Sequence, residues 1–153
     1  MTRDPTETIK ESEPAQFSIT MDQIQDYQFR VKFDKEQLAD LLTDEVPPVG
    51  RDTAPNPSRL LAAAVGNCLC ASFLFSTRKA RANIQGLHAT VRVWHARNEK
   101  GRLRIGKIKV EIEPKFDAAD APKIERCLGL FEDYCIVTQS VRGGIDVSVA
   151  VKS

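Results

Sequence analysis

Four cysteines are the residues of this sequence best suited to chemistry: Cys68, Cys70, Cys127 and Cys135. Four cysteines in 153 residues are too few for a disulfide scaffold, and their spacing lacks the paired Cys-x-x-Cys of a structural zinc site. The chain begins without the apolar segment of a secretory signal, so we expect a cytoplasmic protein with reduced thiols. In that setting a cysteine matters through the reactivity of its thiolate, and neither a cofactor nor a metal is expected.

The four thiols are not equivalent. Cys68 and Cys70 are two residues apart on an expected helix, so their side chains point about 200° apart and cannot act as a vicinal pair. A free cysteine is most often a small buried hydrophobe, and we expect this packing role for Cys70 and Cys127. Cys68 differs because it follows Gly66–Asn67, a small and polar break in an apolar run. Cys135 differs because it stands at the expected start of a helix, whose dipole stabilises a thiolate.

Charge and the remaining motifs argue against several other functions. Lys and Arg number 22 against 21 Asp and Glu, a net charge of +1 that creates no overall field to attract nucleic acid or an anionic membrane. We therefore expect neither of them as a partner. His88 and His95 lie an odd number of residues apart on an expected strand and so point to opposite faces, which argues against a shared metal. No Gly-x-Ser-x-Gly motif supports a serine hydrolase.

The residues around Cys68 predict a long helix over positions 57 to about 81. Asn56 is a good N-cap and Pro57 suits the first helical position, while arginine and lysine close the helix as its dipole favours. Residues 60–77 carry no charge, and a run of 18 residues reaches the minimum length of a membrane span. Because polar residues interrupt the run and the chain's mean hydropathy is −0.30, we expect instead a helix buried on all sides.

Alternating apolar residues predict antiparallel strands on both sides of this helix. Residues 17–21 and 27–33 alternate strictly and predict a hairpin with one wet face. Residues 35–45 fit either a helical turn or a third strand. A second hairpin is expected from about 87–94 and 102–112, and its apolar parity changes at Gly106, which predicts a bulge there.

The last third of the chain predicts two helices and one strand. Asp117 or Asp120 is expected to cap the first helix, whose apolar face would hold Ile124, Cys127, Leu128 and Phe131. A short helix from about Cys135 to Val141 is expected to stop at Gly143, followed by a strand over 145–151. Residues 1–16 are expected to form a flexible arm and residues 17–153 a single domain. Because the strands come in runs, the order favours an α+β fold with largely antiparallel sheets.

The segment 54–68, Ala-Pro-Asn-Pro-Ser-Arg-Leu-Leu-Ala-Ala-Ala-Val-Gly-Asn-Cys, resembles the central-helix signature of the OsmC/Ohr family, the osmotically inducible and organic hydroperoxide resistance proteins. The second family cysteine is present as Cys135 within 132–140, and the order of elements matches from about Phe17. The resemblance implies an OsmC-like α+β fold around a long buried central helix. It also implies an intertwined homodimer with its active sites at the subunit interface.

The resemblance further implies a cysteine-based peroxidase that acts in oxidative stress defence. Cys68 would attack an organic hydroperoxide and become a sulfenic acid, and Cys135 would condense with it to a disulfide. A thiol or lipoyl reductant would restore both thiols. The alternative is a binding protein of the same fold, whose cysteines are inert and whose interface pocket holds a small apolar ligand.

The sequence departs from the family pattern at two positions. Family peroxidases place a glutamate after the Asn-Pro pair, where it meets an arginine from the N-terminal hairpin, and this chain has Ser58 there. The second cysteine is followed by Ile136 where the family usually has proline. Arg30, on the polar face of the second strand, is the candidate for the activating arginine, and Arg51 is the alternative. Loss of the glutamate favours the binding protein.

Overall fold

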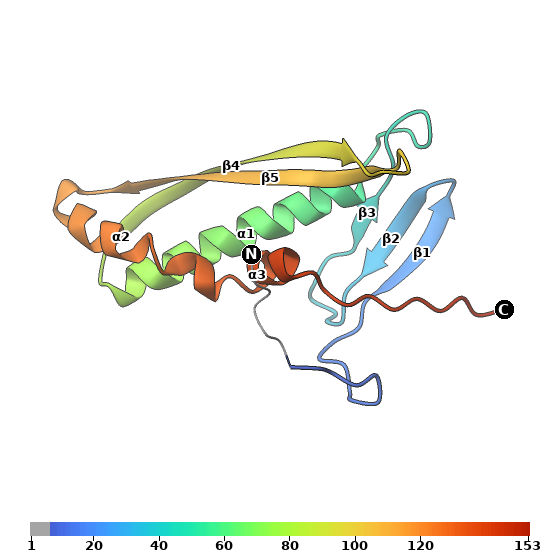
Figure 1. The fold of residues 1–153 in the computed structure, drawn as a ribbon, viewed down its shortest axis with the longest axis horizontal. Coiled ribbons are helices and arrows are strands. Elements are labelled where there is room, and N and C mark those ends of the chain that lie inside the picture. The colour runs from blue at the N-terminus through green and yellow to red at the C-terminus, as the bar shows by residue number, and fades with distance from the viewer. Residues whose placement is uncertain (1–6) are drawn as a thin grey trace. The chain divides into compact units, whose positions relative to one another are not determined.

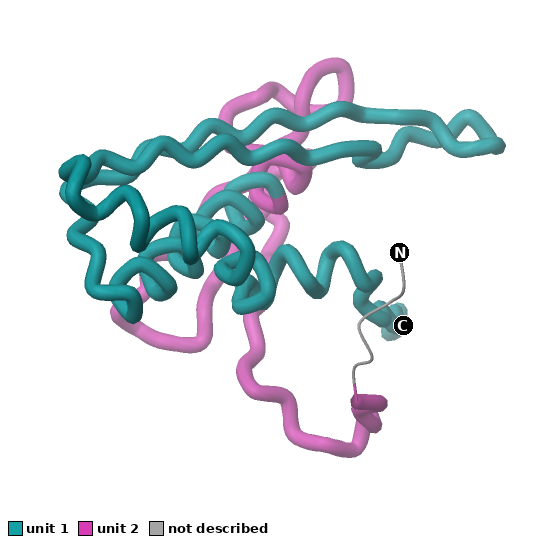
Figure 2. The backbone as a smooth tube through the Cα atoms, turned by 60° about the vertical axis from the view of Figure 1, so that its left-hand side comes forward, with its two compact units in different colours: residues 1–5, 62–153 teal, residues 6–61 magenta. Residues whose placement is uncertain are grey.

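The computed structural model describes residues 7–153, which fall into two compact units (Figure 2). One unit ends at Leu61 and the other runs from Ala62 to Ser153. Residues 1–6 of the expected arm lie outside the described residues, and residues 7–16 are exposed and form only a short turn. The expectation of a single domain over residues 17–153 stays a prediction.

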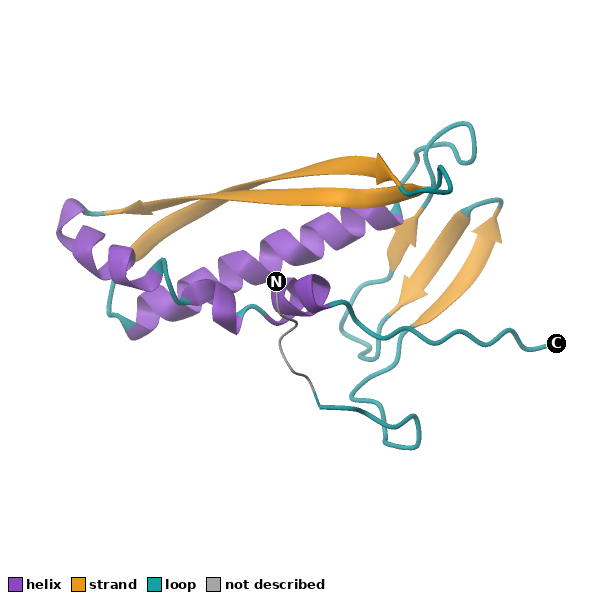
Figure 3. Ribbon diagram, viewed as in Figure 1, coloured by secondary structure: helices purple, strands orange, loops and turns teal. Residues whose placement is uncertain are grey.

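The unit that ends at Leu61 contains a three-stranded antiparallel sheet (Figure 3). Its strands pair in the order β1, β2, β3 and span Thr20–Gln25, Gln28–Lys32 and Leu41–Thr43. The expected hairpin is confirmed, with a tighter turn than expected because β1 continues to Gln25. Asp26 in this turn has a φ of 47°, a left-handed conformation that aspartate tolerates better than most residues. Within the ambiguous segment 35–45, Leu41–Thr43 form the strand β3.

The apolar face of this hairpin is largely exposed. Met21 and Val31 are paired across the strands, yet Val31 is 3% exposed and Met21 is 60% exposed. Phe17 and Tyr27 are also more than half exposed. The register places Met21 and Val31 on one face as expected, whereas Phe17 and Tyr27 lie just outside the two strands.

Helix α1 (Pro57–Lys79) begins directly after its predicted capping residue, Asn56. The side-chain oxygen of Asn56 accepts the backbone N–H of Arg59 at 3.1 Å, which is the usual N-cap hydrogen bond. The last turn holds Arg78 and Lys79, where the helix dipole favours cations. The helix thus ends about two residues before its expected end.

The single chain buries α1 on one face, and burial of this helix on all sides stays a prediction. The buried positions recur every three or four residues along one face: Ala62, Val65, Gly66, Leu69, Ser72, Phe73, Ser76 and Thr77. Ala64, Asn67, Ala71 and Phe75 are exposed, because one hairpin and a few short helical segments cover only part of the helix surface. Among residues 7–153, α1 is the one helix long and apolar enough to cross a bilayer, and core helices of soluble proteins meet the same criteria.

A long hairpin runs along α1 in the second unit (Figure 1). Its two antiparallel strands are β4 (Ile84–Arg97) and β5 (Leu103–Phe116). The pairing register shifts at Gly106, which confirms the predicted bulge. A Cβ atom at Gly106 would lie 2.8 Å from Cβ of Ala96, so the bulge has no room for a larger residue. Gly66 likewise allows a close approach between α1 and β4, because a Cβ there would lie 2.6 Å from Cγ2 of Val91 on β4.

Short helical segments follow the hairpin: η1 (Ala118–Asp120), α2 (Ala121–Cys127), η2 (Phe131–Tyr134) and α3 (Ile136–Gly143). Asp117 and Asp120 occupy the N-cap positions of η1 and α2, as predicted, but neither makes a side-chain capping hydrogen bond. Asp120 instead accepts the backbone N–H of Asn83 at 3.0 Å and pairs with Lys123 at 2.9 Å, so its carboxylate ties α2 to the start of β4. The helix ends at Cys127, which leaves Leu128 55% exposed rather than on the apolar face.

The predicted last strand is not formed in the single chain. Residues after Gly144 are extended but unassigned to any strand, and Ile145, Val147, Val149 and Val151 are 64% to 94% exposed. A strand forms only where a second backbone edge accepts its hydrogen bonds, and no described residue of this chain pairs with the segment. The rest of the prediction, an α+β fold with antiparallel sheets, is confirmed.

Candidate active site: a pair of thiols

Two of the four cysteines meet in one buried cluster of the second unit. Cys68 projects from the middle of α1, and Cys135 is the N-cap residue of α3. Both belong to the cluster built on Val65 and Leu69, and both are free thiols. The Cys68 thiol hydrogen-bonds with the Cys135 sulfur. The pair comes together because α3 starts against the face of α1 that carries Cys68.

Cys135 has polar partners although it is fully buried. Its Sγ lies 3.1 Å from Oγ1 of Thr138, and the residue is 0% exposed. Burial raises the pKa of the Cys135 thiol, but hydrogen bonds with Thr138, Cys68 and Ser72 outweigh burial and hold this pKa below its ordinary value. Cys135 makes no regular side-chain cap on α3, and the backbone N–H of Thr138 nevertheless adds to the lowering.

The pKa of the Cys68 thiol is shifted in the opposite direction. Burial raises the pKa of its thiol above the ordinary value, and the neighbouring Cys135 raises it further. The backbone N–H groups of Val137 and Ile136, in the first turn of α3, act against this rise because they point at the sulfur and favour its negative form. None of these strongest effects comes from a cation. Within the second unit, burial, the α3 backbone and the neighbouring Cys135 are the main influences on the pKa of Cys68.

The other two cysteines have the surroundings of packing residues. Cys127 is 5% exposed, and its thiol donates to the backbone oxygens of Ser76 at 3.4 Å and Lys123 at 3.3 Å. Cys70 is partly buried, and burial raises the pKa of its thiol. Among residues 7–153, no cluster of three or more His, Cys, Asp or Glu side chains could hold a metal ion.

The two candidate arginines belong to the unit that ends at Leu61, and each has a carboxylate partner there. Arg30 lies 3.5 Å from Asp40, and Arg51 lies 2.9 Å from Asp26. All four side chains are more than one third exposed. The role of Arg30 beside Cys68 stays a prediction. Within its own unit the Arg30 guanidinium pairs with Asp40.

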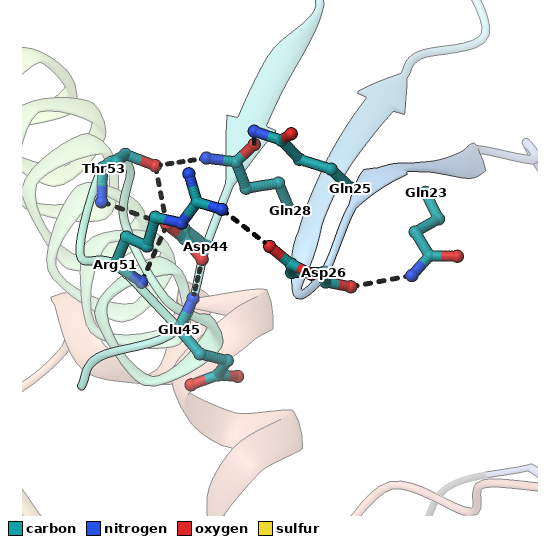
Figure 4. A network of polar contacts seen from close by, with 8 residues as sticks. All are labelled: Gln23, Gln25, Asp26, Gln28, Asp44, Glu45, Arg51 and Thr53. Carbon is teal, nitrogen blue, oxygen red and sulfur yellow. Dashed lines mark hydrogen bonds and ion pairs between the residues drawn. The ribbon is translucent and has the colours of Figure 1, made fainter. Parts of the chain in front are cut away.

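A buried carboxylate in the same unit is a polar centre that the sequence does not single out. Asp44 is 2% exposed, and it accepts the Thr53 hydroxyl at 2.6 Å and the backbone N–H of Glu45 at 2.8 Å (Figure 4). The Thr53 hydroxyl is the main cause that lowers the pKa of Asp44 to about 2, with further help from backbone N–H groups and against the effect of burial. The chain has 21 acidic residues, and no local pattern marks this one.

Asp44 holds the loop that follows it. The backbone N–H of Arg51 donates to its carboxylate at 3.3 Å, and a Cβ at Gly50 would lie 2.5 Å from Asp44 Oδ1. A cavity of about 240 Å³ opens beside this loop, lined by Asp26, Tyr27, Gln28, Asp44, Pro48, Val49, Gly50 and Arg51. Because every hydrogen bond of Asp44 is satisfied by the chain itself, this carboxylate is a structural clamp.

Residues 50–150 match the family model described as OsmC-like protein. A Vibrio cholerae OsmC-like protein of unknown function superposes with a TM-score of 0.71 at 16% identity, over 83% of this chain and 94% of that one. An organic hydroperoxide resistance protein from Elizabethkingia anophelis gives a TM-score of 0.63 at 18% identity, over 86% and 91% of the two chains. No curated protein matches the sequence.

A third similar structure carries a bound molecule. It is a putative organic hydroperoxide resistance protein from Vibrio cholerae, with captopril in one of its active sites. Its TM-score is 0.61 at 21% identity, over 90% of this chain and 92% of that chain. These identities are low enough that the three structures establish the fold of this chain and leave its chemistry to its own residues.

Proposed function

The chain belongs to the OsmC-like protein family, and from this premise we propose that it is a thiol-dependent hydroperoxide reductase. Family membership points to hydroperoxide resistance as the general role. The observation that carries the finer proposal is the contact between Cys68 and Cys135 at the start of α3. Two free thiols within interacting range can be oxidised to a disulfide without a large rearrangement.

The proposed reaction uses each thiol once. The Cys68 thiolate attacks one oxygen of the hydroperoxide, the O–O bond breaks, and the departing alkoxide takes a proton and leaves as the alcohol. Cys68 is left as a sulfenic acid. The Cys135 thiolate then attacks the Cys68 sulfur, forms a disulfide and displaces hydroxide, which leaves as water after protonation. An external dithiol supplies the two electrons that restore both thiols.

A turnover assay tests this proposal. The full chain is mixed with tert-butyl or cumene hydroperoxide and either dithiothreitol or dihydrolipoamide, and loss of peroxide is followed. We expect consumption far above that of the reductant alone. Equal rates with and without the protein, for both peroxides and both reductants, would contradict the proposal.

The raised pKa of Cys68 predicts a steep pH dependence of this activity. Burial and Cys135 keep Cys68 largely protonated at neutral pH, and only the thiolate is nucleophilic. Below its pKa the thiolate fraction grows about tenfold per pH unit, so the peroxide rate constant is expected to rise by nearly that factor between pH 7 and 8. Stopped-flow measurement under excess peroxide gives the profile. A flat profile over this range would mean that a cation ionises Cys68.

The same raised pKa favours the second candidate, a binding protein of this fold with unreactive thiols. Such a protein would hold a small apolar ligand and would not consume peroxide. Mass spectrometry after mild peroxide treatment separates the two functions. A disulfide peptide containing Cys68 and Cys135 supports the reductase, and two unmodified thiols support the binding protein.

We also propose that two copies of the chain associate. The exposed face of α1 carries Ala64, Ala71 and Phe75, and Phe75 is 52% exposed. The segment 145–151 exposes a row of valines without a strand partner. Apolar surface of this extent on a folded chain is typical of an interface, and a second copy would cover it. Cytoplasmic location and the lack of nucleic-acid or membrane partners stay predictions.

Sedimentation velocity tests the association. The full chain is expected to sediment as a dimer at micromolar concentration, and Phe75→Glu is expected to shift it to the monomer because a buried carboxylate without a partner opposes association. Leu103→Glu is the matched control, because Leu103 is also 53% exposed but lies at the far end of the β4–β5 hairpin. A monomeric parent chain at this concentration would refute the dimer.

A further inference from the structure

The two thiols of the pair differ in access. Cys135 is 0% exposed, whereas Cys68 is partly exposed. A thiol that opens a disulfide must bring its sulfur up to one of the two sulfur atoms, and the rate depends on which of them it can reach. In the single chain Cys68 is therefore the residue of the pair that an incoming molecule can reach.

Two hydroxyl groups from different helices converge on Cys135. Thr138 stands in the first turn of α3 and places its Oγ1 3.1 Å from Cys135 Sγ. Ser72 stands one turn after Cys68 on α1 and also hydrogen-bonds with Cys135. Both residues are less than 10% exposed, at 6% and 7%. A hydroxyl can accept from a thiol and can also donate to a thiolate, so both hydroxyls remain bonded when Cys135 ionises.

Apolar side chains pack around the pair: Ile108, Val110 and Ile112 of β5, Phe131 of η2 and Val137 of α3. The pKa of Cys135 is lowered and that of Cys68 is raised. In thiol–disulfide exchange the sulfur with the lower pKa leaves faster.

We propose that the reducing thiol attacks the disulfide at Cys68 and expels Cys135, and that Thr138 and Ser72 are positioning residues for this leaving thiolate. The inference rests on the proposed function in one respect, the Cys68–Cys135 disulfide. The reductant's thiolate forms a bond to Cys68 Sγ, the S–S bond breaks, and its electron pair stays on Cys135. The second thiolate of the dithiol then attacks the first sulfur of the same dithiol, which is bonded to Cys68 in this mixed disulfide. Cys68 departs and takes up a proton, and the reductant leaves as a cyclic disulfide.

A trapping experiment reads the direction of attack without any peroxide. Diamide oxidises the full chain, a brief exposure to 2-mercaptoethanol opens the disulfide, and N-ethylmaleimide at low pH quenches the reaction for peptide mass spectrometry. We expect mercaptoethanol on Cys68 and maleimide on Cys135. The reverse labelling overturns the inference, and so does a failure of diamide to join the two cysteines. If the labelling is as expected but peroxide turnover is absent, the inference holds and the proposed reductase fails.

Variants of the hydroxyl residues test their role in positioning. Thr138→Val keeps the shape but removes the hydroxyl, and it is expected to raise the titration midpoint of Cys135 by about one pH unit, read from the ¹³Cβ chemical shift of the reduced protein. The rate of disulfide opening should fall several-fold, and Thr138→Ser should restore both values.

Ser72→Ala is expected to act in the same direction as Thr138→Val. Its matched control is Ser76→Ala, one turn further along α1, where a buried hydroxyl has no hydrogen-bond partner. If the Cys135 midpoint is unchanged in Thr138→Val and Ser72→Ala, the positioning role is refuted. Ser72→Ala and Thr138→Ser keep the test decisive even if Thr138→Val does not fold.

Discussion

Replacing Cys68 with serine is expected to reduce peroxide consumption to the rate of the reductant alone. A serine hydroxyl stays protonated at neutral pH and cannot accept oxygen to form a sulfenic acid, so the change removes the nucleophile and the oxidisable atom together. The substitution leaves a hydroxyl that can still hydrogen-bond with Cys135, and it nearly preserves side-chain volume. Unfolding should therefore change little, and a peroxide assay with dithiothreitol measures the loss directly.

Cys70→Ser is the matched control for this variant. Cys70 lies two residues further along the same helix, is also partly buried, and likewise has a raised thiol pKa. We expect Cys70→Ser to retain at least half of the parent rate. Equal loss in both variants would indicate that damage to α1, rather than chemistry at Cys68, explains the result.

Cys135→Ser separates the two steps of the proposed cycle. In the absence of a reductant this variant should consume about one equivalent of peroxide and then stop. Its Cys68 sulfenic acid should persist long enough to react with dimedone, which adds a mass that locates the adduct. A variant that continues to turn over with a dithiol would show that the reductant can reach the sulfenic acid directly.

Phe73→Ala is expected to lower the free energy of unfolding by about 3–5 kcal/mol, as large-to-small core substitutions do. Phe73 is 2% exposed and belongs to the cluster with Ala82 and Ile124. Its ring meets Phe131 edge-on, with centroids 5.5 Å apart and an interplanar angle of 90°. Removal of the ring leaves a cavity between α1 and the segment that follows the hairpin. Urea unfolding at one fixed protein concentration measures the change.

Leu128→Ala serves as the control for Phe73→Ala. Leu128 is 55% exposed just after α2, and substitutions at such positions usually change stability by less than about 0.5 kcal/mol. A similar small change in both variants would show that the Phe73 cluster is not the core of this unit.

Local sequence signals predicted the parts of the fold that depend on neighbouring residues. The Asn56 cap and the start of α1 are confirmed, because the hydrogen bond of an N-cap spans only three residues. The bulge at Gly106 is confirmed as well, since a change of parity along a strand has few other geometric explanations. The helix start predicted at about Cys135 is confirmed, because Cys135 is the N-cap residue of α3.

The errors arise where long-range partners decide the outcome. Asp120 is the N-cap residue of α2, as predicted, but its carboxylate binds Asn83 and Lys123 in place of a backbone N–H of the first turn, a choice that no local pattern encodes. The uniform apolarity of α1 indicates how much of its surface must eventually be covered, and it cannot show that one chain covers only one face. The strand expected over 145–151 has the right side-chain alternation and lacks a pairing edge in the single chain.

The candidate site was partly predictable for the same reason. Cys68 and Cys135 stood out through their neighbours in sequence, whereas Ser72 and Thr138 did not, because buried serine and threonine side chains are common in helices and rarely mark a site. Spacing could have suggested them, since each lies three or four residues after one of the two cysteines, on the same helix face. The expected activating role of Arg30 came from the resemblance alone and stays a prediction.

The exposed C-terminal segment also predicts that heating inactivates the protein by aggregation. Residues 145–151 alternate isoleucine or valine with small or acidic residues and contain no proline. Exposed segments of this composition from different chains pair as strands of an intermolecular β-sheet, and the chains then aggregate. Copies that separate on warming are therefore expected to precipitate rather than reassociate, with an apparent melting temperature that rises with the heating rate. The lifetime of the assembled protein, rather than its equilibrium stability, would then determine how long it survives in warm solution.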